Sequence, residues 1–547
     1  MAPYVWPSTM TASPLESSTL DHVAASRWPR RTAADVLGLG LVLAVVVALP
    51  AAPSDLDRHQ LPKESVMHLA TWLAVVLARP ALGRGLSRAT LVGLGAFVLL
   101  SVTSAVFATN PFLALRATSL TATGIVAFLT ARALADQGLG DRLLRWCGIA
   151  AGVGVATALA QAYGADSILF ASTRAPGGTF GNRNFMAHFS ALALPILLSM
   201  TLSTRRGSVA ILASMAVAAL TVGIVLSRSR TAWIGAPCGL TAYLILLMPA
   251  WRNRAVPVER SRVLLLAAAV AVGVIGAPLL PNSLRWRDDE SPYAKTLTGL
   301  VNAKEGSGHG RLIQYGNTLK LAARHPVLGV GPGNWPIRYG DVAPPNDPAW
   351  AYGDTVPLNP WPSSDWMALL SERGIAGMLA ILLVGAASLW RGVRGVRAGG
   401  SRTMAATTLV ALLVIAAVEG VFDAILLLPA PLFLVALAGG SLLAGADGVA
   451  ADNLSEQPAS RWSPAVAVLL GLIVIRSGMQ TAAYVVAGNG RSLARLNWAA
   501  RIDPTSYPIR IALAMRTPCA SARDDARAAL RLAPGWPAPR AAVRRCG

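Results

Sequence analysis

Long apolar runs recur along this 547-residue chain, and short groups of arginines separate them. A run of about 18 to 25 apolar residues is long enough to cross a hydrocarbon core of roughly 30 Å as an α-helix. Hydrophobic residues make up 54% of the chain and charged residues only 14%, a balance that excludes an ordinary soluble protein. The runs lack the alternation of barrel strands. The sequence therefore predicts an all-α fold, a polytopic membrane helix bundle.

We place this bundle at residues 32–487 and expect about twelve or thirteen transmembrane helices in it. Some of the runs are short or carry a charge, so both counts are acceptable. The candidate spans are residues 34–49, 66–78, 89–107, 112–134, 143–163, 185–202, 208–226, 231–251, 263–280, 366–390, 404–428, 432–444 and 464–487.

The net charge of +21 indicates the orientation of the bundle rather than a nucleic-acid partner, because the arginines lie in short groups between the spans. With a cytoplasmic N-terminus, nearly every basic group falls on the cytoplasmic side, as the Lys/Arg bias of membrane proteins requires. Residues 1–31 are then a disordered cytoplasmic leader. The large loop 281–365 and the tail 488–547 lie outside.

The tail is predicted to form helical pairs. Residues 499–504, Ala-Ala-Arg-Ile-Asp-Pro, resemble residues 529–534, Ala-Leu-Arg-Leu-Ala-Pro, about thirty residues later. This spacing is similar to that of tetratricopeptide-like repeats, although two copies are a short series. In an oxidising compartment Cys519 and Cys546 could form a disulfide, and an unpaired state is equally acceptable.

Arginines on the outer side are exceptions to the charge bias and need a reason. Arg228 and Arg230 lie where one span ends outside and the next begins, and Arg311 is expected to open an amphipathic helix that continues toward His325. Snorkelling to lipid headgroups is one explanation. The other is an anion site, because guanidinium groups bind phosphate oxygens bidentately and stay charged. The glycine-rich residues 324–335 lack the Lys-Ser/Thr ending of a P-loop, which excludes nucleotide hydrolysis of that type.

Five segments together resemble the signatures of one membrane family. Residues 174–185 read Arg-Ala-Pro-Gly-Gly-Thr-Phe-Gly-Asn-Arg-Asn-Phe, and residues 229–233 read Ser-Arg-Thr-Ala-Trp. The Gly310-Arg311 pair, the His-Pro-x-x-Gly-x-Gly segment that begins at His325 and residues 364–377 follow in order. Covering roughly residues 174–390, this set resembles the O-antigen ligase and polymerase superfamily.

The resemblance implies a bacterial inner-membrane enzyme with its large loop and C-terminus in the periplasm. It implies inverting transfer of a glycan from an undecaprenyl diphosphate carrier to a lipid A-core, protein or glycan acceptor, with neither a metal nor a cofactor. Arg230 and Arg311 would bind the diphosphate, with Arg228 and Arg174 as further candidates. Asn182, Asn184 and Glu372, which lie in the matching segments, are supporting candidates. Fixed cations fit this step because charge grows on the leaving diphosphate.

The sequence departs from the family at the residue thought to activate the acceptor. The histidine expected there is replaced by Ser363, whose hydroxyl is too weakly basic to act as a general base. Asp365 could take the proton, although a carboxylate there is also a common helix cap. His325 or His309 could fold into the site, or transferase activity could be lost. Glu419 and Asp423, four residues apart, form a second candidate acid pair.

These observations leave several functions open. A glycosyltransferase of the ligase class leads, and ligase, polymerase and protein-glycosylating enzyme share the same signatures. The repeat-like tail favours a protein acceptor or a protein partner. A non-catalytic relative that binds a lipid-linked glycan or supports envelope assembly is the alternative that Ser363 favours. A transporter is disfavoured because the chain shows no convincing inverted repeat.

Overall fold

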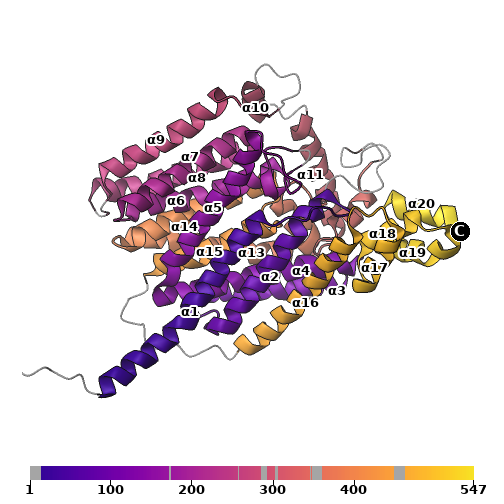
Figure 1. The fold of residues 1–547 in the computed structure, drawn as a ribbon, viewed down its shortest axis with the longest axis horizontal. Coiled ribbons are helices and arrows are strands. Elements are labelled where there is room, and N and C mark those ends of the chain that lie inside the picture. Colours follow the sequence, from indigo (N-terminus) through magenta and orange to yellow (C-terminus); the bar gives the residue numbers. More distant parts are fainter. Residues whose placement is uncertain are drawn as a thin grey trace, which may run out of the picture.

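The computed structural model describes residues 14–171, 174–254, 256, 258–284, 292–301, 306–344, 347, 360–448 and 462–546. Every regular element in these ranges is helical, which confirms the predicted all-α fold. Long helices run side by side through the body, and the C-terminal helices gather at one end of it (Figure 1).

The helices follow the chain in the order labelled in Figure 1. In the first half these are α1 Pro14–Val46, α2 Asp55–Ala78, α3 Arg88–Val106, α4 Pro111–Leu134, η1 Ala135–Leu139, α5 Gly140–Ala162, η2 Gly178–Phe180, α6 Arg183–Ser203, α7 Gly207–Ser227, α8 Arg230–Arg252 and α9 Arg260–Leu279. In the second half they are α10 Pro292–Val301, α11 Gly306–Arg324, α12 Trp335–Arg338, η3 Tyr339–Asp341, α13 Asp365–Ala398, α14 Arg402–Phe422, α15 Pro429–Asp447, α16 Ser463–Ala487, α17 Leu493–Ile502, α18 Tyr507–Arg516, α19 Cys519–Leu532 and α20 Pro537–Cys546.

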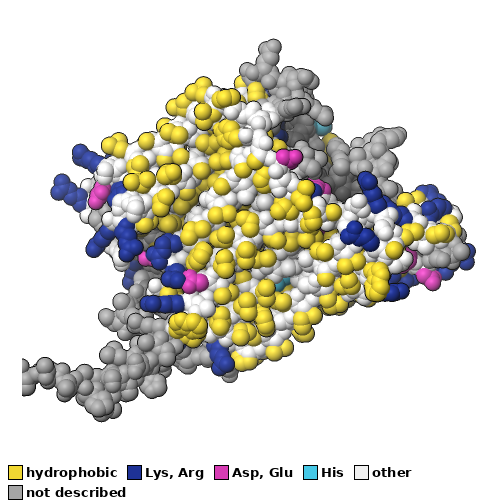
Figure 2. All heavy atoms as spheres, in the orientation of Figure 1, with side chains coloured by type: hydrophobic (Ala, Val, Ile, Leu, Met, Phe, Trp, Pro, Cys, Tyr) yellow, Lys and Arg dark blue, Asp and Glu magenta, His cyan; other side chains and the backbone are white. Residues whose placement is uncertain are grey.

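Ten helical segments in the described residues are long and apolar enough to cross a membrane. One of them, Pro111–Ala162, contains two of the predicted spans, which the non-helical residues Gln137 and Gly138 separate. The predicted span 66–78 lies in α2, and the predicted span 34–49 begins in α1 and extends past its end at Val46; neither helix is among the ten. Figure 2 shows apolar side chains over the body and Lys and Arg toward its two ends, so the chain is a multi-pass membrane protein.

The most buried membrane helices are α6 and α15. In each, 83% of the apolar window is buried, compared with 22% in the peripheral helices α9 and α16. Helix α14 packs against α8, α13, α15 and α6. The end of α14 and the start of α6 are therefore surrounded by other helices of the bundle.

Two sequence predictions of helix starts need correction. Helix α1 begins at Pro14, so part of the predicted disordered leader is helical, and residues 1–13 lie outside the described residues. Helix α11 begins at Gly306, so Arg311 lies beyond its first turn. The prediction that Arg311 opens this helix is therefore wrong, and Arg311 lies outside the terminal turn in which the helix dipole acts.

The tail contains two helical pairs with the same local geometry. Helices α17 and α19 end at Ile502 and Leu532, thirty residues apart. After each end, an arginine Nε donates to a proline carbonyl oxygen at 2.7 Å, Arg510 to Pro504 and Arg540 to Pro534. The thirty-residue repeat is thus present in the structure, while its tetratricopeptide-like character stays a prediction. Cys519 is disulfide-bonded, and the side chain of Cys546 lies outside the described residues.

Candidate functional site

A cavity of about 690 Å³ opens at the end of the bundle that carries α11 and the tail. Its walls come from α2, α4, the start of α6, α11, the segment that joins α14 to α15, and tail helix α18. Of the residues predicted from the sequence, the cavity is lined by Arg174, Asn182, Asn184, Arg311, Ser363, Glu372 and Asp423.

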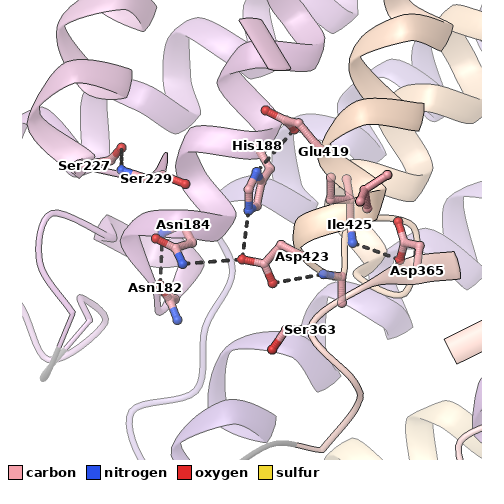
Figure 3. A network of polar contacts seen from close by, with 12 residues as sticks. Asn182, Asn184, His188, Ser227, Ser229, Ser363, Asp365, Glu419, Asp423 and Ile425 are labelled. Carbon is pink, nitrogen blue, oxygen red and sulfur yellow. Dashed lines mark hydrogen bonds and ion pairs between the residues drawn. The ribbon is translucent and has the colours of Figure 1, made fainter. Parts of the chain in front are cut away.

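Asp423 is the centre of the polar network at this cavity (Figure 3). Its Oδ2 accepts from Asn184 Nδ2 at 3.4 Å, lies 3.2 Å from His188 Nε2, and lies 3.5 Å from Arg311 Nη2. Its Oδ1 accepts from the backbone N–H of Ala424 at 2.9 Å. Three helices, α6, α11 and α14, thus meet on one carboxylate.

His188 connects Asp423 to a second carboxylate deeper in the bundle. Its Nδ1 lies 3.2 Å from Glu419 Oε2, and both side chains are completely buried. Helix α8 leaves room for Glu419 through Gly235, because a Cβ there would lie 2.3 Å from Glu419 Cγ. Buried charges in a membrane bundle are stable only when they are paired, and His188 lies within 3.2 Å of both acids.

The contacts of Asp423 determine its charge. Burial would by itself raise the pKa of this carboxyl, but the His188 hydrogen bond and the charges of His188 and Arg311 hold the pKa below its usual range. Asp423 is therefore ionised at neutral pH while it faces the cavity.

Asp365 does not line the cavity. Its carboxylate accepts from the backbone N–H groups of Ile425 and Leu426 at 3.0 to 3.2 Å, and only 2% of the residue is exposed. Figure 3 shows it turned toward Ile425 and away from Asp423. The sequence offered Asp365 as a possible helix cap, but the residue that caps α13 is Ser364, whose Oγ accepts from Met367 N. Asp365 binds the α14–α15 connection instead and is outside the cavity lining.

Ser363 is held at the cavity through its backbone. Its carbonyl oxygen lies 2.5 Å from the Tyr315 hydroxyl, and its N–H donates to Gln314 Oε1 at 2.9 Å. The Tyr315 hydroxyl also lies 2.8 Å from the Val421 carbonyl oxygen. Burial raises the pKa of Tyr315 to about 12, so it remains a neutral donor. Helix α11 thus fixes both Ser363 and the end of α14.

The five arginines near the site differ in position. Arg174 and Arg311 line the cavity. Arg228 donates from Nε to Thr296 Oγ1 at 2.9 Å, and Arg230 lies against Gly299, so both contact α10 beside the cavity. These guanidinium groups are close enough to repel one another: Arg228 and Arg311 repel Arg230, and Arg174 and Arg228 repel Arg183. We call the five arginines the cationic cluster.

Asn182 caps helix α6, because its Oδ1 accepts from Asn184 N at 2.9 Å. This cap fixes the direction from which α6 enters the bundle. One helical turn separates Asn184 from His188, so both reach Asp423. The supporting role predicted for the two asparagines thus has a geometric basis.

Glu372 and His325 occupy structural positions. Glu372 is buried and accepts from the backbone N–H groups of Gly333 and Trp335 at 2.8 and 3.3 Å. Gly374, at φ 69°, leaves room for the Val327 carbonyl oxygen, which a Cβ would approach to 2.1 Å. His325 is outside the cavity lining, and burial lowers its pKa. The glycine-rich segment therefore packs against the bend of α13 instead of bringing a base to the site.

Sequence reasoning missed His188. The signal was available: Asn184 and His188 on one helix and Glu419 and Asp423 on another are both separated by four residues, which places each pair on one helix face.

In the described residues, no group of three or more His, Cys, Asp or Glu side chains could hold a metal ion.

One family model matches the middle of the chain. Residues 215–382 match the family model described as O-Antigen ligase, and this range includes Arg228, Arg230, Arg311 and Ser363. No curated protein matches the chain. The matched region contributes Arg311 and Ser363 to the cavity lining and Arg228 and Arg230 beside it, whereas Arg174, Asn184, His188 and Asp423 lie outside that region. Residues 215–382 of this multi-pass membrane protein are thus similar to the O-antigen ligase type of family.

Proposed function

We propose that this protein is a glycosyltransferase that transfers a glycan from an undecaprenyl diphosphate carrier to an acceptor hydroxyl on the periplasmic side of the bacterial inner membrane. The observation that carries this proposal is the arrangement of an ionised carboxylate, Asp423, beside Arg311 in a cavity that Arg174 also lines. Such a site provides both charges that a displacement at a sugar carbon needs.

The cationic cluster supports a diphosphate leaving group. Arg174 and Arg311 line the cavity together with Asp423, and Arg230 lies beside it. A diphosphate bound near these arginines gains negative charge as its bond to the sugar breaks. Guanidinium groups held before the reaction lower the free energy of that transition state without a reorganisation step.

Asp423 replaces Asp365 as the group expected to accept the proton. In the proposed step, the acceptor oxygen bonds to the anomeric carbon, the bond from that carbon to the diphosphate oxygen breaks, and the hydroxyl proton passes to Asp423. A single displacement inverts the anomeric carbon. Because its lowered pKa makes Asp423 a weak base, proton transfer comes late, when the attacking hydroxyl has become acidic.

The replacement of the family histidine by Ser363 favours a second candidate, a protein that binds the lipid-linked glycan without transferring it. The two functions predict different behaviour of Asp423→Asn. A transferase loses product but keeps the donor bound. A binding protein keeps its full cellular function.

A deletion strain tests the proposal. Surface polysaccharide should be lost or shortened on deletion and restored by the wild-type gene. Neither Arg311→Ala nor Asp423→Asn should restore it. Arg324→Ala is a matched control, because Arg324 is an exposed arginine at the end of the same helix α11 and is outside the cavity lining. Full restoration by both site variants at normal protein levels would contradict the proposal.

A further inference from the structure

The C-terminal tail forms one wall of the cavity. The lining residues from the tail belong to α18 and to the turn before α20: Tyr507, Pro508, Ile511, Ala512, Met515, Arg516 and Trp536. The proposed donor-binding residues lie on other elements, α11 and the segments around 174 and 423. A molecule in the cavity is thus bounded by the O-antigen ligase domain and by the tail together.

Several contacts hold the tail in this place. Trp536 Nε1 donates to the Pro336 carbonyl oxygen at 2.9 Å, and Asn110 Nδ2 donates to the Leu532 carbonyl oxygen at 3.1 Å. Arg476, on membrane helix α16, pairs with Asp503 at 3.0 Å. The tail is anchored to α4, the large loop and α16, so its cavity wall has a fixed position.

The charges at the tail end differ from those at the arginine end. Arg116 on α4 binds Glu64 through Nη2 at 2.8 Å and Asp57 through Nη1 at 2.7 Å, so its single positive charge already faces two carboxylates. Asp55 and Arg516 also line the cavity. A diphosphate gains nothing here, and the tail end suits a group without negative charge.

The rest of this wall is apolar and aromatic. Tyr507 packs edge-on against Phe112 and Trp536, and the side chains of Ile511 and Met515 are half-buried at the cavity. A surface with apolar faces beside a few fixed polar groups is typical of sites for small organic ligands. A sugar ring is complementary to such a surface. Its C–H faces are apolar, and the hydroxyl groups at its edge can donate hydrogen bonds to carboxylates.

We infer that the tail end of the cavity is the acceptor subsite of the proposed transferase, that it binds an uncharged saccharide, and that α18 determines which acceptor fits. This inference rests on the proposed function. It assigns the acceptor to the tail, so a change in α18 should alter acceptor use and leave donor binding intact.

Ala512→Trp tests this assignment by filling the tail end. Ala494→Trp is the matched control, because Ala494 is an exposed alanine on α17 outside the cavity lining. Binding to the full-length purified protein is measured with two probes: undecaprenyl diphosphate, and delipidated oligosaccharide from the surface of the same strain. Ala512→Trp should weaken oligosaccharide binding about tenfold or more and leave undecaprenyl diphosphate binding unchanged. If Ala512→Trp accumulates poorly, Ile511→Ala serves as a second variant. This smaller change should also weaken oligosaccharide binding.

The outcomes separate the two proposals. Unchanged oligosaccharide binding in Ala512→Trp and Ile511→Ala overturns the tail assignment, while the function stands if Arg311→Ala still fails in the deletion strain. If a folded Ala512→Trp variant binds neither undecaprenyl diphosphate nor oligosaccharide, the two ends of the cavity are not separate subsites. This result also overturns the tail assignment. A third outcome would also overturn the saccharide assignment. If the purified protein does not bind oligosaccharide measurably and a glycosylated protein is lost from cells that carry Ala512→Trp, the acceptor is a protein.

Discussion

Two buried aspartates, Asp365 and Asp423, lie side by side and have opposite surroundings. The Asp365 N–H donates to the Asp423 carbonyl oxygen at 3.2 Å, so the two residues share one junction of α13 and α14. Backbone N–H groups surround the Asp365 carboxylate, whereas side chains from α6 and α11 bind that of Asp423 at the cavity. Proximity to a motif is therefore a poor guide to reactivity, because the groups that already bind a carboxylate decide what else it can do.

The largest expected effect is that of Asp423→Asn. The amide cannot accept the acceptor proton, and it also removes the negative charge beside Arg311. We expect transfer to fall by about 10² to 10⁴, the range for loss of a general base. The rate of glycan transfer by the purified protein measures this. A fall of only two- or threefold in a correctly folded variant would show that the base lies elsewhere.

Arg311→Ala should follow, with a loss of about 10² in transfer, because a fixed cation no longer meets the charge that grows on the leaving diphosphate. Arg311→Lys should recover only part of this loss, since an ammonium group cannot bind two phosphate oxygens in the bidentate geometry. Measuring kcat and KM for the lipid-linked donor separates binding from chemistry. Equal activity of the lysine variant and the wild type would contradict bidentate binding.

His188→Gln should have a smaller effect on the rate and a distinct effect on its pH dependence. The pKa of Asp423 is depressed in the folded protein, so its ionised form, and the stability that this form contributes, is lost only as pH falls through that depressed value. Without the imidazole this pKa should rise. We expect the acid limb of the activity profile to move to higher pH in this variant. An unchanged acid limb would show that His188 does not position or charge Asp423.

The smallest effect on activity is expected for Asp365→Asn, which should keep transfer within a few-fold of the wild type. Its effect should fall on stability, because the amide accepts less strongly from Ile425 and Leu426, with a loss of about 1 to 3 kcal/mol in the free energy of unfolding. Thermal unfolding in detergent measures this. A large loss of transfer at unchanged stability would reverse the assignments of the two aspartates.

The sequence predicted the arginines better than the acids. Arg174 and Arg311 line the cavity and Arg230 lies beside it. These arginines could be selected from the sequence because they break the predicted Lys/Arg bias or lie in the matching segments. The proton acceptor could not be chosen in the same way. Ser363, Asp365 and His325 come from matching segments, but only Ser363 reaches the cavity and Asp365 is bound to backbone groups.

By itself, the sequence determined that this chain is an all-helical membrane bundle with an O-antigen ligase-type region, because the length and polarity of apolar runs depend only on residue order. The tertiary structure decided which ionisable groups meet. The contacts from His188 and Arg311 to Asp423, and from the tail to the cavity, join residues that are more than a hundred positions apart or lie on different helices. Spacing along one helix specifies a face, whereas the partner of that face depends on how the helices pack.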